Sequence, residues 1–152
     1  MLVAEEGFVK EHTLGGKAKE FLWRMEPGGA ISIRRKFKNL GGKFVEQTIS
    51  AAELKRLDEY MDDGNWKPLA NDVAKLRRRE EKDGIGRFFY EELGLDESGA
   101  QLASHVGAIF SSSGAWLHNG KKRGMEFKRN TGDWAGAVKD YYRKKLSAGN
   151  IS

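Results

Sequence analysis

The chain has 152 residues, of which 39% are hydrophobic and none is cysteine, and its formal net charge is +5. This length and apolar content suffice for one domain, or two small packed domains, with a buried core. The lack of cysteine excludes disulfides and cysteine-ligated zinc, and no apolar run reaches the roughly eighteen residues of a membrane span. We therefore expect a cytoplasmic α+β protein with no membrane partner.

Three glycine pairs predict a β-meander in the first fifty residues. Gly15–Gly16, Gly28–Gly29 and Gly41–Gly42 recur every thirteen residues between segments with a β pattern. Glycine tolerates the positive φ angles of hairpin turns, so this spacing predicts four antiparallel strands joined in sequence. The predicted strands span residues 8–13, 20–26, 30–38 and 43–49.

The third predicted strand has one apolar face and one basic face. Side chains alternate along a strand, so Ile31, Ile33 and Phe37 share one side. The opposite side carries the cations Arg34, Lys36 and Lys38.

A capping box at Ser50-Ala51-Ala52-Glu53 predicts the start of a helix. Leu54, Leu57 and Met61 follow at helical spacing, and Asp62–Asn65 ends the pattern. We expect this helix to lie on the apolar face of the sheet.

A change of hydrophobic period from two to about 3.6 after Asn65 suggests a domain boundary. It divides the chain into a meander-plus-helix module at 1–65 and a helical module with a hairpin at 66–152, or both pack as one domain. In the second module the pattern predicts a helix after Pro68, helices at 85–93 and 99–111, a hairpin at 115–129 turning at Asn119-Gly120, and a last helix at 133–146.

The segment 30–61 resembles the single-stranded-DNA-binding transcriptional coactivator family, including its plant and purine-rich-element relatives. The residues that carry the resemblance are the strand 31–38, the turn 39–42, the strand 43–49 and the capped helix after Ser50. The resemblance implies a sheet that binds unpaired strands, with Arg34, Lys36 and Lys38 in that role, and a connection to transcription.

Aromatic residues of the second strand suggest a base-stacking surface. Phe21 and Trp23 share one face of that strand. Aromatic rings beside a basic face can stack on bases while the cations follow phosphates. The other interpretation is that both rings are core residues beneath the helix, because large aromatics are usually buried.

Positive charge gathers near the C-terminus. Between Lys121 and Lys145 there are nine Lys or Arg residues against three Asp or Glu. Such a local excess is typical of a surface that contacts phosphates, although a solvated face has the same composition.

The order of helix, short connection, helix and basic hairpin in the second half is also that of a winged helix-turn-helix. Four residues of the second helix would then face a major groove, and three cations of the hairpin would contact phosphates. These residues are Gln101, Ser104, His105, Ala108, Lys121, Lys122 and Arg123.

Signals for catalysis are weak. Glu126-Phe127-Lys128 matches the E-x-K pattern of metal-dependent nucleases, but the companion Asp is missing just upstream. Gly84-Ile85-Gly86 lacks the rest of a phosphate-binding motif, and we interpret it as a flexible start to a helix. We assign no catalytic residue, metal or cofactor.

The sequence thus favours a nucleic-acid-binding protein that prefers single-stranded DNA or RNA. One alternative is a homo-oligomeric assembly module whose anchors are Trp134, Tyr141 and Tyr142 on the last helix. A weaker alternative is a metal-dependent nuclease that uses Glu126 and Lys128.

Overall fold

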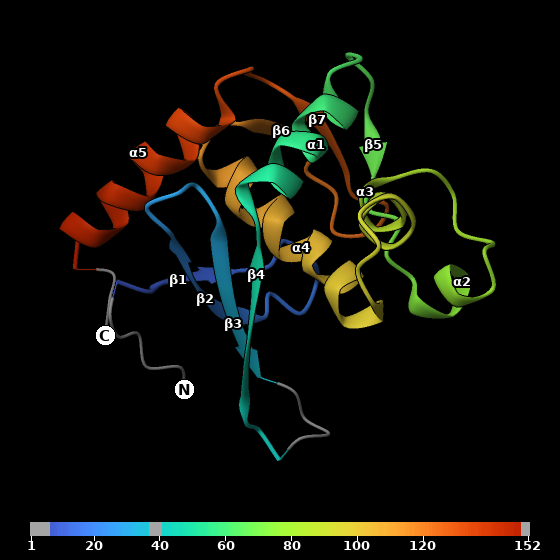
Figure 1. The fold of residues 1–152 in the computed structure, drawn as a ribbon, viewed down its shortest axis with the longest axis horizontal. Helices are drawn as coiled ribbons and strands as arrows, with labels where there is room; N and C mark the ends of the chain where they lie inside the picture. Colours follow the sequence, from blue (N-terminus) through green and yellow to red (C-terminus); the bar gives the residue numbers. More distant parts are fainter. Residues whose placement is uncertain (1–6, 37–40, 150–152) are drawn as a thin grey trace.

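Two antiparallel sheets of unequal size organise the computed structural model, which describes residues 7–36 and 41–149 (Figure 1). The larger sheet has four strands in the order β1-β2-β3-β4 and confirms the predicted meander. Its strands are β1 (Val9–His12), β2 (Glu20–Met25), β3 (Ile31–Lys36) and β4 (Phe44–Ile49). Phe37 and Lys38 lie outside the described residues.

The turn between β2 and β3 shows why glycine stands at these positions. Gly29 has a φ of 96° and donates its backbone N–H to the Glu26 carbonyl oxygen at 2.9 Å. A side chain is strained at such a positive φ. The turn sets the register in which Trp23 lies opposite Ile33.

Helix α1 (Ala51–Met61) begins at the predicted capping box. The Glu53 N–H donates to Ser50 Oγ at 3.1 Å, and the Ser50 N–H donates to Glu53 Oε1 at 2.9 Å. Leu54, Leu57 and Met61 are buried as expected.

The remaining elements give a short-helix region, a hairpin and a long last helix. Asp72 rather than Pro68 begins the helix there, because Pro68 pairs as a strand residue with Glu126. The elements are β5 (Lys67–Pro68), α2 (Val73–Arg77), α3 (Ile85–Arg87), the π-helical turn η2 (Phe88–Glu92), α4 (Glu97–Ser112), β6 (Trp116–His118), β7 (Glu126–Arg129) and α5 (Trp134–Ser147). Strands β5, β7 and β6 form the second sheet in that order.

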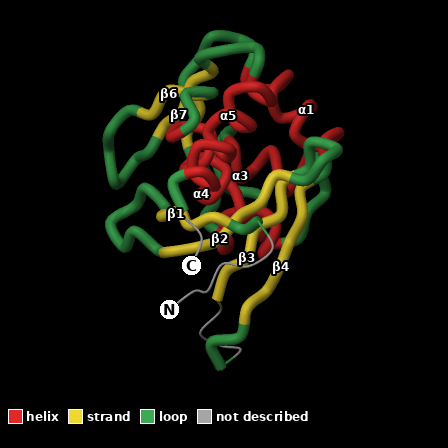
Figure 2. The backbone as a smooth tube through the Cα atoms, turned by 90° about the vertical axis from the view of Figure 1, so that its left-hand side faces the viewer, coloured by secondary structure: helices red, strands yellow, loops and turns green. Residues whose placement is uncertain are grey.

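Helix α4, rather than α1, lies between the two sheets. His105 meets the Phe21 ring of β2 at 4.7 Å between ring centroids, while Gly107 faces the Phe127 ring of β7. Figure 2 shows the helices gathered on one side of the larger sheet. The expectation that α1 covers the sheet is wrong, because α4 is the more apolar helix and takes that place.

Helix α1 packs instead toward the small sheet. The Arg129 guanidinium of β7 donates to both carboxylate oxygens of Asp58, at 2.9 and 3.0 Å, and to Asp62 at 2.7 Å. These bonds lie on the polar side of α1, and they raise the pKa of Arg129.

One buried cluster connects the predicted modules. It combines Trp23 and Ile33 of the larger sheet with Phe110, Phe127 and Val138 from the second half of the chain. The core therefore crosses the boundary suggested after Asn65.

The segment Gly84–Gly86 is packed tightly. A Cβ atom at Gly84 would collide with the Pro68 carbonyl oxygen, and one at Gly86 with that of Ala70. The Gly86 N–H donates to the Leu69 carbonyl at 2.7 Å. The expectation of a flexible helix start is wrong, because these glycines let two backbone segments cross at close range.

Within the ranges that the structure describes, no helix is both long enough and apolar enough to cross a membrane.

Candidate nucleic-acid interface

One cation of the predicted basic sheet face, Arg34, is paired with a carboxylate, as is Arg24 on β2. Arg34 Nε lies 2.9 Å from Glu46 Oε1, and Arg24 Nε lies 3.0 Å from Glu26 Oε2. Both guanidinium groups also lie over the Phe8 ring, at 4.1 and 4.5 Å. Arg34 is therefore not a free cation on an open face, which corrects the expectation.

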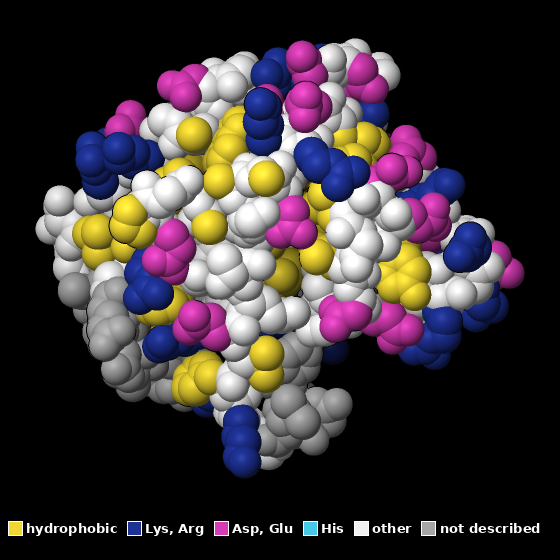
Figure 3. All heavy atoms as spheres, in the orientation of Figure 1, with side chains coloured by type: hydrophobic (Ala, Val, Ile, Leu, Met, Phe, Trp, Pro, Cys, Tyr) yellow, Lys and Arg dark blue, Asp and Glu magenta, His cyan; other side chains and the backbone are white. Residues whose placement is uncertain are grey.

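The second predicted cation of this face, Lys36, is exposed, and its Nζ lies 5.4 Å from the centroid of the Phe44 ring, which is itself 45% exposed. The role of Lys36 in binding nucleic acid stays a prediction. Lys38 lies outside the described residues. Figure 3 shows Lys and Arg side chains interspersed with Asp and Glu over the face that it displays.

Phe21 and Trp23 are fully buried, so the prediction that they stack on bases is wrong. Helices α4 and α5 cover the face that carries them. The Trp23 ring lies 6.1 Å from that of Tyr141, and its Nε1 donates to Glu11 at 3.3 Å. These rings are core residues, as the second interpretation held.

Helix α4 buries part of the face predicted to contact a major groove. Gln101 and Ser104 are partly exposed, but His105 is 7% exposed and Ala108 is fully buried. Burial, with a contribution from Arg35, lowers the pKa of His105 to about 3. The groove-facing role is wrong for His105 and Ala108, which are buried where α4 packs between the two sheets; for Gln101 and Ser104 it stays a prediction.

The aromatic residues of α5 are engaged within the chain. The Trp134 ring stacks on Phe110 at 5.6 Å. Tyr141 donates to Glu11 at 2.8 Å, and Tyr142 donates to the Gly7 carbonyl at 2.6 Å. Burial, followed by the Glu11 carboxylate, raises the pKa of Tyr141. These three side chains stay partly exposed, and the assembly alternative stays a prediction.

The β6–β7 hairpin exists, but its turn is longer than expected. Residues 119–125 form a loop, so the cations predicted on a strand extend from that loop instead. Asn119 closes its base: its side-chain amide donates to the Gly124 carbonyl at 3.0 Å, and its Oδ1 accepts the Lys121 N–H at 3.1 Å. The prediction of a two-residue turn at Asn119-Gly120 is therefore wrong, because the connection spans residues 119–125.

The loop carries three consecutive exposed cations, Lys121, Lys122 and Arg123. No ion pair joins their side chains to a carboxylate of the residues that the structure describes. Positions 119–129 hold five Lys or Arg residues and a single Glu. This loop is thus a part of the predicted basic cluster that stays open to a polyanion; Lys139, Arg143 and Lys144 of α5 are exposed as well.

Two large apolar side chains near the loop escaped the sequence analysis. Trp66, just before β5, is 42% exposed, and Leu117 on β6 is 44% exposed. Trp66 adds an exposed aromatic ring next to the sheet whose hairpin carries the three loop cations, a combination expected of the larger sheet. The one signal in the sequence that could have identified Trp66 was its position directly before a strand that contains a proline.

Glu126 and Lys128 are partly exposed on β7. In the described part of the chain, no three His, Asp or Glu side chains are grouped so as to hold a metal ion. The nuclease alternative therefore gains no second carboxylate and stays a prediction.

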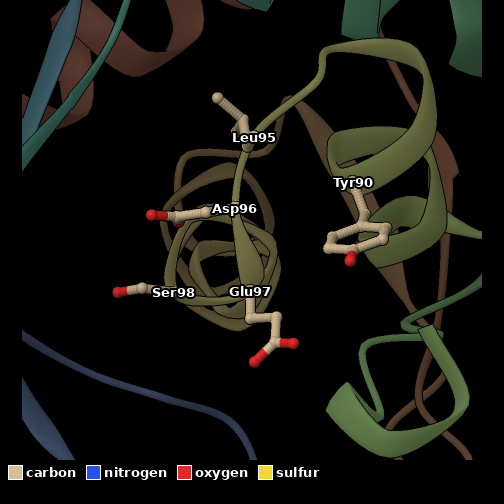
Figure 4. A pocket seen from close by; sticks show the side chains of 5 residues that line it. All are labelled: Tyr90, Leu95, Asp96, Glu97 and Ser98. Carbon is tan, nitrogen blue, oxygen red and sulfur yellow. The ribbon is translucent and has the colours of Figure 1, made fainter. Parts of the chain in front are cut away.

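Three polar side chains that line a hollow of about 500 Å³ are already bonded within the chain (Figure 4). Asp96 caps α4 through the Gly99 N–H, Glu97 holds Arg77, and Ser98 accepts from Arg35. Figure 4 shows Asp96 and Ser98 pointing away from Tyr90, which lies across the hollow. These side chains serve the fold, so the hollow is not the candidate site.

Comparison with models of protein families, with curated proteins and with solved structures finds no match to this chain.

Proposed function

We propose that the protein binds nucleic acid through the β6–β7 loop and prefers single-stranded DNA or RNA to duplex. The observation that carries the proposal is the run Lys121, Lys122 and Arg123, exposed at a loop and without a carboxylate partner among the described residues. A role in transcription rests on the resemblance of residues 30–61 alone and stays a prediction.

The construction of the loop supports this function. Asn119 bonds both sides of the loop base and so limits the positions that the three cations can take. Cations that are already held near one another lose less conformational freedom on binding a phosphate backbone. Each phosphate contact releases counterions, which makes binding depend on salt concentration.

Fluorescence anisotropy with labelled single-stranded oligonucleotides tests the proposal. Between about 50 and about 200 mM salt, we expect affinity to fall steeply, with each contact adding about 0.7 to the slope of log K against log salt. The triple variant Lys121→Gln, Lys122→Gln, Arg123→Gln should lower that slope by about 2.

A matched control is available in another run of three exposed cations, Arg77–Arg79. Arg77 and Arg78 already pair with Glu97 and Glu80, so replacing all three residues with Gln should leave the slope near that of the wild type. If the wild type does not bind at low salt, or if both triple variants lose affinity equally, the proposed function is wrong.

A further inference from the structure

We infer that the outer face of the small sheet is a platform on which an unpaired base stacks against Trp66. The inference rests on the proposed function and specifies its ligand: a strand whose bases are free, held by stacking as well as by charge. The platform is defined by Trp66, Lys128 and Leu117.

Lys67 fixes the direction of Trp66. The Lys67 side chain is buried, with Nζ 2.6 Å from Asp63 Oδ2 and 4.6 Å from the centroid of the Tyr60 ring. Successive side chains of an extended chain point to opposite sides, so Trp66 is directed outward. Its 42% exposure agrees with this direction.

The strand register brings the three platform residues into one row. Lys67 lies opposite Phe127, so continuing that register by one residue places Trp66 beside Lys128. Lys128 in turn lies opposite Leu117. Two spacings between strands separate Trp66 from Leu117 by about 10 Å, with the Lys128 position between them.

This row matches the chemistry of a nucleotide with an unpaired base. The exposed indole offers a flat surface for a base, and the amino group of Lys128 is available for the phosphate next to it. In a duplex the base faces are already stacked on one another, so none is free to stack on the exposed indole. The platform therefore favours an unpaired strand.

Charge argues for a polyanion over a second copy of this chain as the occupant. Leu117 and Lys128 belong to β6 and β7, which lead directly into the loop with Lys121, Lys122 and Arg123. A phosphate backbone that leaves the platform along β7 would pass one carboxylate, Glu126, and then reach these cations. A second copy also carries a formal charge of +5, which disfavours contact at this basic region.

The variant Trp66→Ala, with Phe44→Ala as its control, tests the inference. Phe44 is 45% exposed on β4, so it matches Trp66 in exposure but lies outside the platform. We expect Trp66→Ala to weaken binding of an unpaired oligonucleotide by about 5- to 100-fold and Phe44→Ala to leave it unchanged. Trp66→Phe, which keeps an aromatic ring, should restore most of the affinity.

An abasic oligonucleotide, which has the phosphates but no bases, isolates the stacking contribution. Wild type and Trp66→Ala should bind this probe equally, and both should keep the same salt slope. Binding of the natural unpaired strand should quench tryptophan fluorescence in the wild type, and Trp66→Phe should lose that quenching while it still binds.

The outcomes separate this inference from the proposed function. If the wild type binds unpaired strands and Trp66→Ala binds them equally well, the platform is wrong while the loop proposal holds. If Trp66→Ala instead converts a dimer to a monomer in sedimentation, a second copy covers this face and the inference is overturned. If the wild type binds no oligonucleotide, the proposed function itself fails.

Discussion

The two sheets differ in how they place cations and aromatic rings. On the four-stranded sheet Arg34 is paired with Glu46, and Trp23 is enclosed beneath α5. At the small sheet Trp66 is exposed, and the cations of the adjoining loop have no carboxylate partner in the described chain. The same residue types therefore hold one region together and leave the other open to a ligand.

Strand pairing explains part of this difference. Arg34 lies directly opposite Glu46 in the β3–β4 ladder, and residues opposite each other on antiparallel strands are near neighbours. A cation on a strand is thus readily offset by the facing strand. Lys121–Arg123 lie in a loop, where no facing strand supplies a carboxylate. The number of Lys and Arg residues is therefore a better indicator of a ligand-binding surface in a loop than on a strand that is paired within a sheet.

The largest expected effect is on stability, and it compares the buried Trp23 with the exposed Trp66. Trp23→Ala should lower the free energy of unfolding by about 3–5 kcal/mol, because it leaves a cavity beneath α5 and removes one of the donors to Glu11. Trp66→Ala should change it by no more than about 0.5 kcal/mol. Urea denaturation measures both values. Similar losses for the two variants would contradict the contrast between the sheets.

The next effect concerns His105 of α4, on the face of the larger sheet that the helices cover. With the pKa of His105 lowered to about 3, the folded protein keeps this ring neutral at pH values where the unfolded chain protonates it, below about 6.5. Stability should therefore fall as pH decreases from about 6.5 toward 3, by about 1.4 kcal/mol per pH unit from this group. Arg35 and Lys19 contribute by disfavouring the charged ring.

Comparison with His105→Gln isolates that contribution from the carboxylates, which also titrate in this range. The free energy of unfolding, measured at several pH values, should decrease less steeply with falling pH in the variant than in the wild type. Equal pH dependence would mean that His105 takes up a proton in the folded protein, and that water reaches this side of the sheet.

The smallest effect concerns the outward cations of the larger sheet. Arg34→Gln should lower the free energy of unfolding by about 0–1 kcal/mol, because Arg34 and Glu46 are partly exposed and such ion pairs contribute little to stability. Its affinity for oligonucleotides should equal that of the wild type. A double-mutant cycle with Glu46→Gln measures the pair, and a loss of nucleic-acid affinity in Arg34→Gln would return the binding surface to this sheet.

Local signals in the sequence predicted much of the fold. Paired glycines marked the turns of the meander, the Ser50 and Glu53 spacing located α1, and the hairpin and last helix followed from their periodicity. The covering of the sheet could not be predicted in this way. It depends on long-range packing, in which α4 inserts Gly107 against Phe127.

The candidate site was predicted in part. The run at Lys121–Arg123 was identified because a local excess of charge is visible in any sequence. Trp66 was missed because its exposure depends on Lys67 turning inward to Asp63 and Tyr60, which are contacts of the folded chain. Phe21 and Trp23 were misassigned because alternation shows which residues share a face, but not which face is covered.

The contacts of α5 with the first strand also set the order in which the chain can be completed. Tyr141 and Tyr142 bond to Glu11 and Gly7, more than a hundred positions earlier in the sequence. During synthesis, the contacts of Tyr141 and Tyr142 with this part of the chain form only after more than a hundred further residues have been translated. Trp23 of β2 is accordingly enclosed by rings that are made long after the strand itself.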